Sequence, residues 1–140
     1  MSERSSGAVE TLLHANAAFY EAFAAGDFVA MQRVWSEDTT VSCLHPGWSA
    51  LRGRDAVLGS WRAILQNPMV VQTRAEVADI VGEVGIVVCV EVLRGVELAA
   101  TNVFVREAGS WRMILHQAGL ISRRQSSRED EGPGPGRLLN

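Results

Sequence analysis

The hydrophobic pattern of the chain changes its period once, near residue 70. Before this point apolar residues recur at intervals of three and four, which is typical of one helix face. After it, segments rich in β-branched residues predict strands over Val70–Val81, Ile86–Leu93, Glu97–Arg106 and Trp111–Ile121. The separators are short, and a parallel connection needs a dozen or more residues. The second half of the chain is therefore expected to form an antiparallel sheet.

The first half predicts three helices and one strand. A helix starts at Ala8, Gly26 is placed to end it, and Asp27 can cap a short second helix. Thr39–His45 alternates as a strand, and Gly53 opens a third helix. Helices segregated from a mostly antiparallel sheet make an α+β domain.

The length of 140 residues predicts a single domain. It is expected to span residues 8–121, between polar termini, 1–7 and 122–140, that are expected to be disordered. No apolar run approaches the roughly 20 residues that cross a bilayer, and the first residues lack the apolar core of a signal peptide. We therefore expect a cytoplasmic protein with no membrane partner.

Charge and residue usage narrow the classes of function. The net charge is −3 and the pI about 5.6, which argues against a nucleic-acid partner. All 13 basic residues are arginine, so a Schiff-base lysine is excluded. Cys43 and Cys89 stand far apart, and no Cys or His pair has the spacing of zinc ligands. We expect no metal and no cofactor.

The stretch "SCLHPGW" holds the strongest candidate for chemistry, His45. Pro46 favours an extended conformation for the residue before it, so the strand is expected to run through His45. Alternation then puts His45 on one strand face with Val41 and Cys43. An imidazole in this place can act as a general base or acid. Alternatively, it is a buried histidine hydrogen-bonded to a backbone carbonyl.

Two polar residues interrupt otherwise apolar strand faces. Asn102 shares its face with Phe104 and can either orient a ligand or tie two strands together. Glu91 is either a carboxylate in an apolar cavity, where its pKa would rise, or the partner of an arginine on the next strand. For Glu91 we expect the pairing, with Arg106 or Arg112.

His116 is a weaker candidate than His45. Regular alternation puts it on the face of Arg112 and Ile114, opposite Trp111 and Met113. An arginine on that face indicates solvent or a dimer interface. A β-bulge in the strand would reverse this assignment.

Three segments carry a resemblance to a known family: "AFYEAFAAGDFVAMQRVWSEDTTV", "HPGWSALRGRDAVLGSWRAI" and "NVFVREAGSWRMILHQAG". Over residues 8–121 the chain resembles the SnoaL-like branch of the nuclear transport factor 2-like superfamily. The resemblance implies a cone-shaped fold in which a curved, mixed, mostly antiparallel sheet wraps around three N-terminal helices. It also implies a pocket for a small hydrophobic molecule, and homodimers formed through the sheets. Function has to be argued from the site, because the fold hosts many activities.

Members of this superfamily include ketosteroid isomerases, polyketide cyclases, dehydratases and non-catalytic assembly modules. The position that resembles the isomerase tyrosine is Phe19, and the base position falls at Cys43 or at His45. Near the second acid stand Thr101 and Asn102, so the isomerase triad is not reproduced.

The sequence leaves two hypotheses of different class. The first is a cofactor-independent isomerase, cyclase or dehydratase, with His45 as general base or acid and Asn102 as hydrogen-bond donor. The second is a non-catalytic ligand-binding or dimeric assembly module. In either case the residues expected to line the pocket are Phe19, Tyr20, Cys43, Trp48, Trp61, Thr101 and Phe104.

Overall fold

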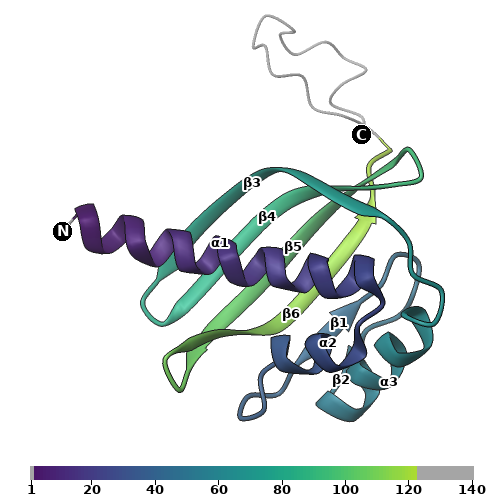
Figure 1. Ribbon diagram of the computed structural model, residues 1–140, viewed down its shortest axis with the longest axis horizontal. Helices are drawn as coiled ribbons and strands as arrows, with labels where there is room; N and C mark the ends of the chain where they lie inside the picture. The colour runs from purple at the N-terminus through teal and green to yellow at the C-terminus, as the bar shows by residue number, and fades with distance from the viewer. Residues whose placement is uncertain (1, 123–140) are drawn as a thin grey trace, which may run out of the picture.

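A computed structural model describes residues 2–122, with side chains from residue 7 onward. In this part of the chain a layer of helices covers one face of a curved sheet (Figure 1). None of its helices has the length and apolar content that crossing a membrane requires. The elements in chain order are α1 (Ser2–Ala25), α2 (Phe28–Val34), β1 (Ser42–Leu44), β2 (Leu51–Arg52), α3 (Arg54–Ile64), β3 (Val71–Val81), β4 (Val84–Leu93), β5 (Val96–Glu107) and β6 (Ser110–Leu120).

The described strands form one sheet in the order β2-β1-β6-β5-β4-β3. Neighbouring strands are antiparallel except for β1 and β6, which run parallel. The parallel pair is possible because α3 and the strands β2 to β5 lie between these two strands in the chain. The predicted α+β class and the curved, mixed, mostly antiparallel sheet are confirmed. The short strand β2 was not predicted, because two residues are too few to show an alternation of apolar and polar side chains.

The helix boundaries follow local chemistry. Gly26 ends α1 with φ of 66°, a left-handed conformation that glycine adopts without strain. Asp27 caps α2 by accepting a hydrogen bond from the backbone N–H of Ala30 at 3.0 Å. Both assignments agree with the prediction. However, α1 begins at Ser2 and not at Ala8, because an established helix gains one hydrogen bond per added residue.

Helix α1 packs against the inner face of the sheet. Leu12 is fully buried and lies on Gly85 of β4, where an added Cβ would come within 2.7 Å of its side chain. A side chain at position 85 would therefore force the end of the Leu12 side chain to shift. Further along α1, Phe19 and Tyr20 are buried against the sheet, as is Trp61 of α3. The aromatic rings of these helices thus fill the space inside the curved sheet.

A β-bulge in β6 decides which side chains of that strand face the interior. The pairing of β5 with β6 shifts between Val103, opposite Leu115, and Phe104, opposite Met113, so Ile114 is an extra residue. Beyond the bulge the alternation is reversed, and His116 points inward with Met113. The outward orientation expected for His116 from regular alternation is therefore wrong.

Candidate functional site

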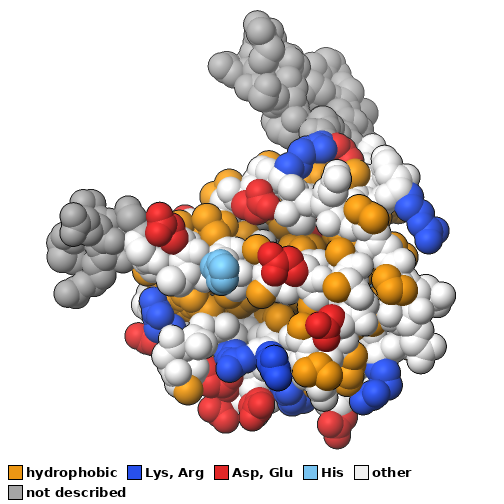
Figure 2. Space-filling model, viewed as in Figure 1, with side chains coloured by type: hydrophobic (Ala, Val, Ile, Leu, Met, Phe, Trp, Pro, Cys, Tyr) orange, Lys and Arg blue, Asp and Glu red, His pale blue; other side chains and the backbone are white. Residues whose placement is uncertain are grey.

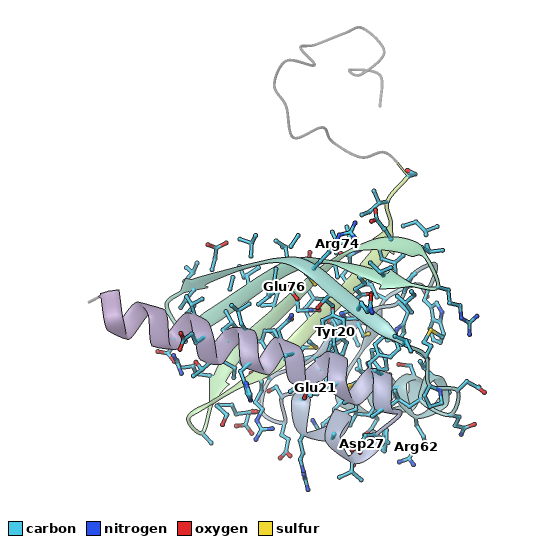
Figure 3. The ribbon with its side chains drawn as sticks, turned by 45° about the horizontal axis from the view of Figure 1, so that its top comes forward. Tyr20, Glu21, Asp27, Arg62, Arg74 and Glu76 are labelled. Carbon is cyan, nitrogen blue, oxygen red and sulfur yellow. The ribbon has the colours of Figure 1, made fainter. Side chains whose placement is uncertain are left out.

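Five polar side chains meet in the interior, between α1 and the sheet. Asn16 and Tyr20 come from α1, Glu91 from β4, Asn102 from β5 and His116 from β6, and each is at most 6% exposed. We call these residues the interior cluster. Figure 3 labels Tyr20 between α1 and the strands and its neighbour Glu21 on the outer side of the helix. A helix and three strands thus converge on one buried point.

Hydrogen bonds connect the interior cluster in a chain. His116 Nδ1 lies 2.6 Å from Asn102 Oδ1, and Asn102 Nδ2 donates to the Tyr20 hydroxyl at 3.0 Å and to Asn16 Oδ1 at 2.8 Å. The Tyr20 hydroxyl donates to Glu91 Oε2 at 2.6 Å. His116 Nε2 lies 3.8 Å from the same Glu91 oxygen, so the chain nearly closes into a ring.

Glu91 contacts a tyrosine and a histidine of the interior cluster. It is 2% exposed, and its partners are Tyr20 and His116, not an arginine. Arg106 instead stacks on the Trp111 ring, and Arg112 donates to a backbone carbonyl of α2. The arginine pairing expected for Glu91 is therefore wrong. The apolar residues on the same strand face as Glu91 were the sequence feature that favoured the other interpretation, a carboxyl group in an apolar interior.

His45 forms a second buried group beside the interior cluster. Its Nε2 lies 2.9 Å from Ser60 Oγ, which donates its own proton to the Val57 carbonyl at 2.6 Å. Ser60 can therefore only accept from His45, which fixes the His45 proton on Nε2. The Cys43 sulfur is 3.5 Å from the same nitrogen. As predicted, Val41, Cys43 and His45 share the buried face of this segment.

Burial disfavours the charged forms of the ionisable interior side chains. It lowers the pKa of His45 to about 4, and together with the neighbouring His45 it lowers the pKa of His116 to about 3. Burial raises the pKa of Glu91, against the opposing hydrogen bond from Tyr20. It also raises the pKa of the Cys43 thiol to about 12. No arginine is buried among the described residues, so the interior lacks a compensating cation.

The expected pocket-lining residues fall into three groups. Phe19, Tyr20, Cys43 and Trp61 lie in the interior, where the Trp61 ring is 4.9 Å from the His45 ring and 6.0 Å from the His116 ring. Trp48 is 50% exposed and packs edge-on against His45, with 4.8 Å between the ring centres. Thr101 and Phe104 lie elsewhere: Thr101 faces outward from the sheet, and Phe104 lines a separate groove.

His45 is covered by aromatic rings. It is 5% exposed and packs between Trp48 and Trp61. The indole N–H of Trp61 is fully buried, and the acceptor beside it is the weakly accepting Cys43 sulfur. The indole N–H of Trp35 is also buried without a hydrogen-bond partner among the described residues. An unpaired buried donor costs about 1–3 kcal/mol. The interior is therefore closed around His45.

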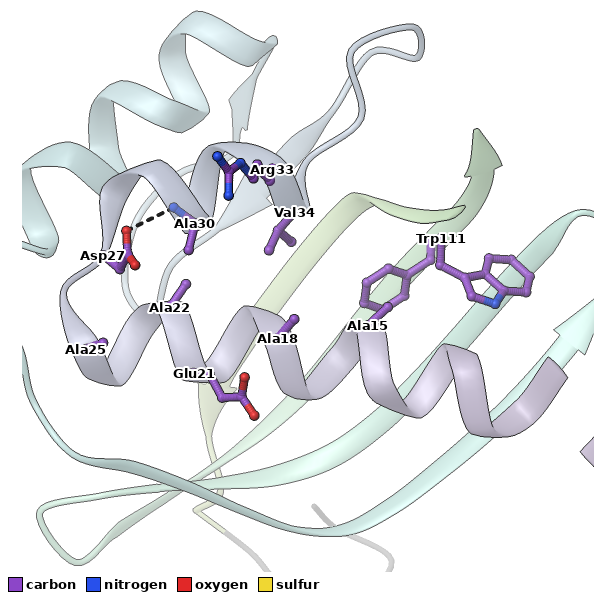
Figure 4. Close-up of a pocket in the computed structure, with 11 residues that line it drawn as sticks. Ala15, Ala18, Glu21, Ala22, Ala25, Asp27, Ala30, Arg33, Val34 and Trp111 are labelled. Carbon is purple, nitrogen blue, oxygen red and sulfur yellow. Dashed lines mark hydrogen bonds between the residues drawn. The ribbon is translucent and has the colours of Figure 1, made fainter. Parts of the chain in front are cut away.

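Two open grooves lie away from His45. One, of about 430 Å³, runs between α1 and α2, where a row of alanines faces Arg33 and Val34 and ends at Trp111 (Figure 4). Apolar side chains line the hollow beside α1, among charged side chains of both signs (Figure 2). The other, of about 450 Å³, lies at the loops around Pro68 and Arg94. His45 lines neither groove.

No metal site is present in the part of the chain that the structure describes. There, no three His, Cys, Asp or Glu side chains gather closely enough to hold an ion. His116 Nδ1 faces the Asn102 amide and His45 Nε2 faces the Ser60 hydroxyl, so these ring nitrogens are engaged by protein groups.

Known proteins share this fold and part of this sequence. A sequence model described as the SnoaL-like domain matches residues 12–121. No curated protein matches the chain. A candidate dehydratase of the nuclear transport factor 2-like family from Streptomyces avermitilis is 32% identical, with a TM-score of 0.78, over 85% of this chain and 99% of that one.

Two other solved structures are similar under different descriptions. A candidate calcium/calmodulin-dependent protein kinase type II association domain from Thiobacillus denitrificans is 35% identical, with a TM-score of 0.72, over 77% of this chain and 93% of that one. A candidate ketosteroid isomerase from Parabacteroides distasonis is 15% identical, with a TM-score of 0.65, over 76% and 84%. At 15% identity the last likeness shows the fold alone.

Proposed function

The chain belongs to the SnoaL-like domain family, and on that premise we propose that it is a cofactor-independent isomerase or lyase that transfers protons in its interior. One observation carries this proposal: the buried, hydrogen-bonded chain from His116 through Asn102 and Tyr20 to Glu91. Buried ionisable groups are costly, and groups with perturbed pKa values gather at sites of acid–base chemistry. The Streptomyces avermitilis relative, a candidate dehydratase, supports the lyase alternative.

The protonation states supply both partners of a proton transfer. Near neutral pH His45 and His116 are neutral, because burial holds their pKa values at about 4 and about 3, and each presents one ring nitrogen with a lone pair as a weak base. Burial shifts the pKa of Glu91 in the direction that favours its acid form. When the surroundings of two neighbouring groups shift their pKa values in opposite directions, one group can act as the acid and the other as the base. We assign His45 as the group that meets the substrate, and the neighbouring His116 with Glu91 as the acid–base pair beside it.

The proposed substrate is a small, uncharged, hydrophobic molecule with one carbonyl or hydroxyl oxygen. Phe19 and Trp61 offer apolar ring surface, and none of the arginines in the described part of the chain is buried where it could neutralise an anion. The N–H of Trp61, which has only the weakly accepting Cys43 sulfur beside it, is the donor for the ligand oxygen. Entry requires movement of Trp48, which is half exposed and is the ring between His45 and solvent.

A deuterium-exchange assay tests the proposal without knowledge of the natural substrate. The protein is incubated in deuterated buffer with neutral bicyclic ketones such as 1-tetralone, and exchange at the carbon beside the carbonyl is followed by NMR. We expect catalysed exchange that His45→Gln abolishes. His14→Gln, at an exposed position, is the matched control and retains full exchange. Native mass spectrometry of protein from its own host adds a second readout, a retained neutral molecule. Absence of both exchange and a retained molecule contradicts the proposal.

A second candidate, a dimeric assembly module, is favoured by the outer face of the sheet. Val77 and Val88 pair on that face and are 54% and 41% exposed, and Val90 and Val103 lie beside them. The Thiobacillus denitrificans relative is a candidate association domain, and its identity is as high as that of the candidate dehydratase. A homodimer through this face would bury the exposed valines.

Light scattering after size-exclusion chromatography tests this second candidate. We expect a dimer in the native protein and a monomer in Val88→Arg, which places a charge in the apolar face. Val29→Arg, at an exposed position on α2, is the matched control and leaves the dimer intact. A monomeric native protein contradicts the assembly role.

A further inference from the structure

Asn102 is the branch point of the interior cluster. It is fully buried, and its side chain forms hydrogen bonds only with side chains of the cluster. Its two amide protons go to Asn16 Oδ1 at 2.8 Å and to the Tyr20 hydroxyl at 3.0 Å. It therefore has no proton left for a ligand, and the donor role expected from the sequence is not open to it.

The orientation of the Asn102 amide follows from its neighbours. The Tyr20 hydroxyl donates its own proton to Glu91 at 2.6 Å, so it can only accept from Asn102. Asn16 likewise presents its carbonyl oxygen to Asn102. The nitrogen of Asn102 must then face these two acceptors, which turns its carbonyl oxygen toward His116.

The carbonyl of Asn102 fixes the proton of His116. An amide oxygen only accepts hydrogen bonds, so His116 Nδ1, at 2.6 Å, must donate. A neutral imidazole carries one N–H, and the other nitrogen, Nε2, then presents a lone pair. That nitrogen lies 3.8 Å from Glu91 Oε2. The lone-pair nitrogen of His116 therefore lies near the only buried carboxyl group among the described residues, at a distance longer than a direct hydrogen bond.

We infer that Asn102 is a positioning residue: it holds His116 in the tautomer protonated on Nδ1, so that Nε2 is the nitrogen that exchanges a proton with Glu91 during turnover. The role in turnover rests on the proposed function, whereas the tautomer does not. The hydrogen bonds of the chain could also run in the opposite direction. Glu91 would then donate to Tyr20, Tyr20 would donate to an Asn102 amide turned by 180°, and His116 would carry its proton on Nε2. The two directions can therefore be told apart by which nitrogen of the His116 ring carries the proton.

Long-range proton–nitrogen NMR correlation of protein labelled with ¹⁵N-histidine reads this position directly. The chain has three histidines, so their signals can be assigned by single substitutions. In the native protein without ligand we expect the Nδ1 signal of His116 to be of the protonated type and the Nε2 signal of the unprotonated type. Protonation on Nε2 in the native protein overturns the inference, whether or not any turnover is found.

Two variants separate positioning from simple packing. Asn102→Leu removes the acceptor for Nδ1, and we expect the His116 proton to move to Nε2, with an interchange of the two nitrogen signals. Asn16→Ala is the matched control, because it removes a partner of Asn102 and leaves the His116 acceptor in place; the Nδ1 proton is expected to stay. A shift of the proton in Asn16→Ala, or an unchanged tautomer in folded Asn102→Leu, overturns the inference. If Asn102→Leu does not fold, the native protein and Asn16→Ala decide.

Because the tautomer is measured without a ligand, a failed exchange assay leaves this inference standing. In a catalytically active protein, Asn102→Asp adds a further readout. It keeps an oxygen acceptor for His116 Nδ1 and adds a buried carboxyl group, which raises the pKa of His116 when ionised. We expect the acid limb of the pH–rate profile to move to higher pH in this variant and to stay unchanged in Asn16→Ala. An unchanged acid limb in Asn102→Asp contradicts the assigned role in turnover.

Discussion

Acidification is expected to unfold this protein through its two buried histidines. Burial holds the pKa of His45 at about 4 and that of His116 at about 3, below the 6.5 of an unburied histidine. The unfolded chain therefore binds protons at these positions at a pH where the folded chain does not. The contribution of each neutral histidine is fully present above pH 6.5 and is lost as the pH falls toward the folded pKa.

The size of the effect follows from these pKa values. Between about pH 7.5 and pH 5 each histidine lowers the free energy of unfolding by about 2 kcal/mol, at 1.36 kcal/mol per pH unit below 6.5. The two together remove about 4 kcal/mol, a large part of the 5–15 kcal/mol that stabilises a typical domain. Glu91 acts in the opposite direction, because its raised pKa favours the folded state as the pH falls.

Urea denaturation followed by circular dichroism at several pH values between 7.5 and 5 measures this loss. We expect His45→Gln to remove about half of the pH dependence and His14→Gln, at an exposed position, to leave it unchanged. Glu91→Gln removes the opposing contribution, so the loss on acidification should become steeper. An unfolding free energy that stays constant over this range, or a slope that His45→Gln does not change, would refute the reasoning.

Three further predictions concern stability. Gly85→Ala should cost about 1–3 kcal/mol, because its new Cβ would lie 2.7 Å from Leu12, and an unchanged urea midpoint would contradict this packing. Asp27→Ala should cost about 1 kcal/mol through loss of the α2 cap, whereas Asp27→Asn keeps a cap oxygen and should cost much less in the same titration. Above pH 9 the free energy of unfolding should fall as the pH rises toward 11, because burial raises the pKa of Cys43 to about 12 and that of Cys89 to about 11. If a Cys43→Ala, Cys89→Ala double variant shows the same loss of stability at high pH as the native protein, the thiols are not its cause.

Much of the fold could be predicted because local patterns agree with the final structure. The glycine and aspartate at positions 26 and 27 and the short turns between the later strands all act over a few residues. The strand predicted over 39–45 is shorter than expected, because β1 covers only Ser42–Leu44 and ends before His45. The burial of Asn102 could also be anticipated from its apolar strand neighbours. His45 was placed correctly on the buried face for the same reason, since alternation and the following proline are both local signals.

The site as a whole was decided by tertiary structure. The outward placement of His116 failed because one extra residue, Ile114, reverses the alternation in β6, and the sequence does not mark such a bulge. The partner of Glu91 was misassigned because Tyr20, 71 positions away in sequence, reaches it from α1.

The sequence by itself determined which residues are polar on apolar faces, since that depends on a period of two or of 3.6 residues. Only the packing of α1 across β4, β5 and β6 decided that these polar residues meet. Asn16 and Tyr20 complete hydrogen bonds that the strands could not satisfy alone. Their pKa values, and with them the chemistry available, depend on burial from water, which is a property of the assembled layers and of no single segment.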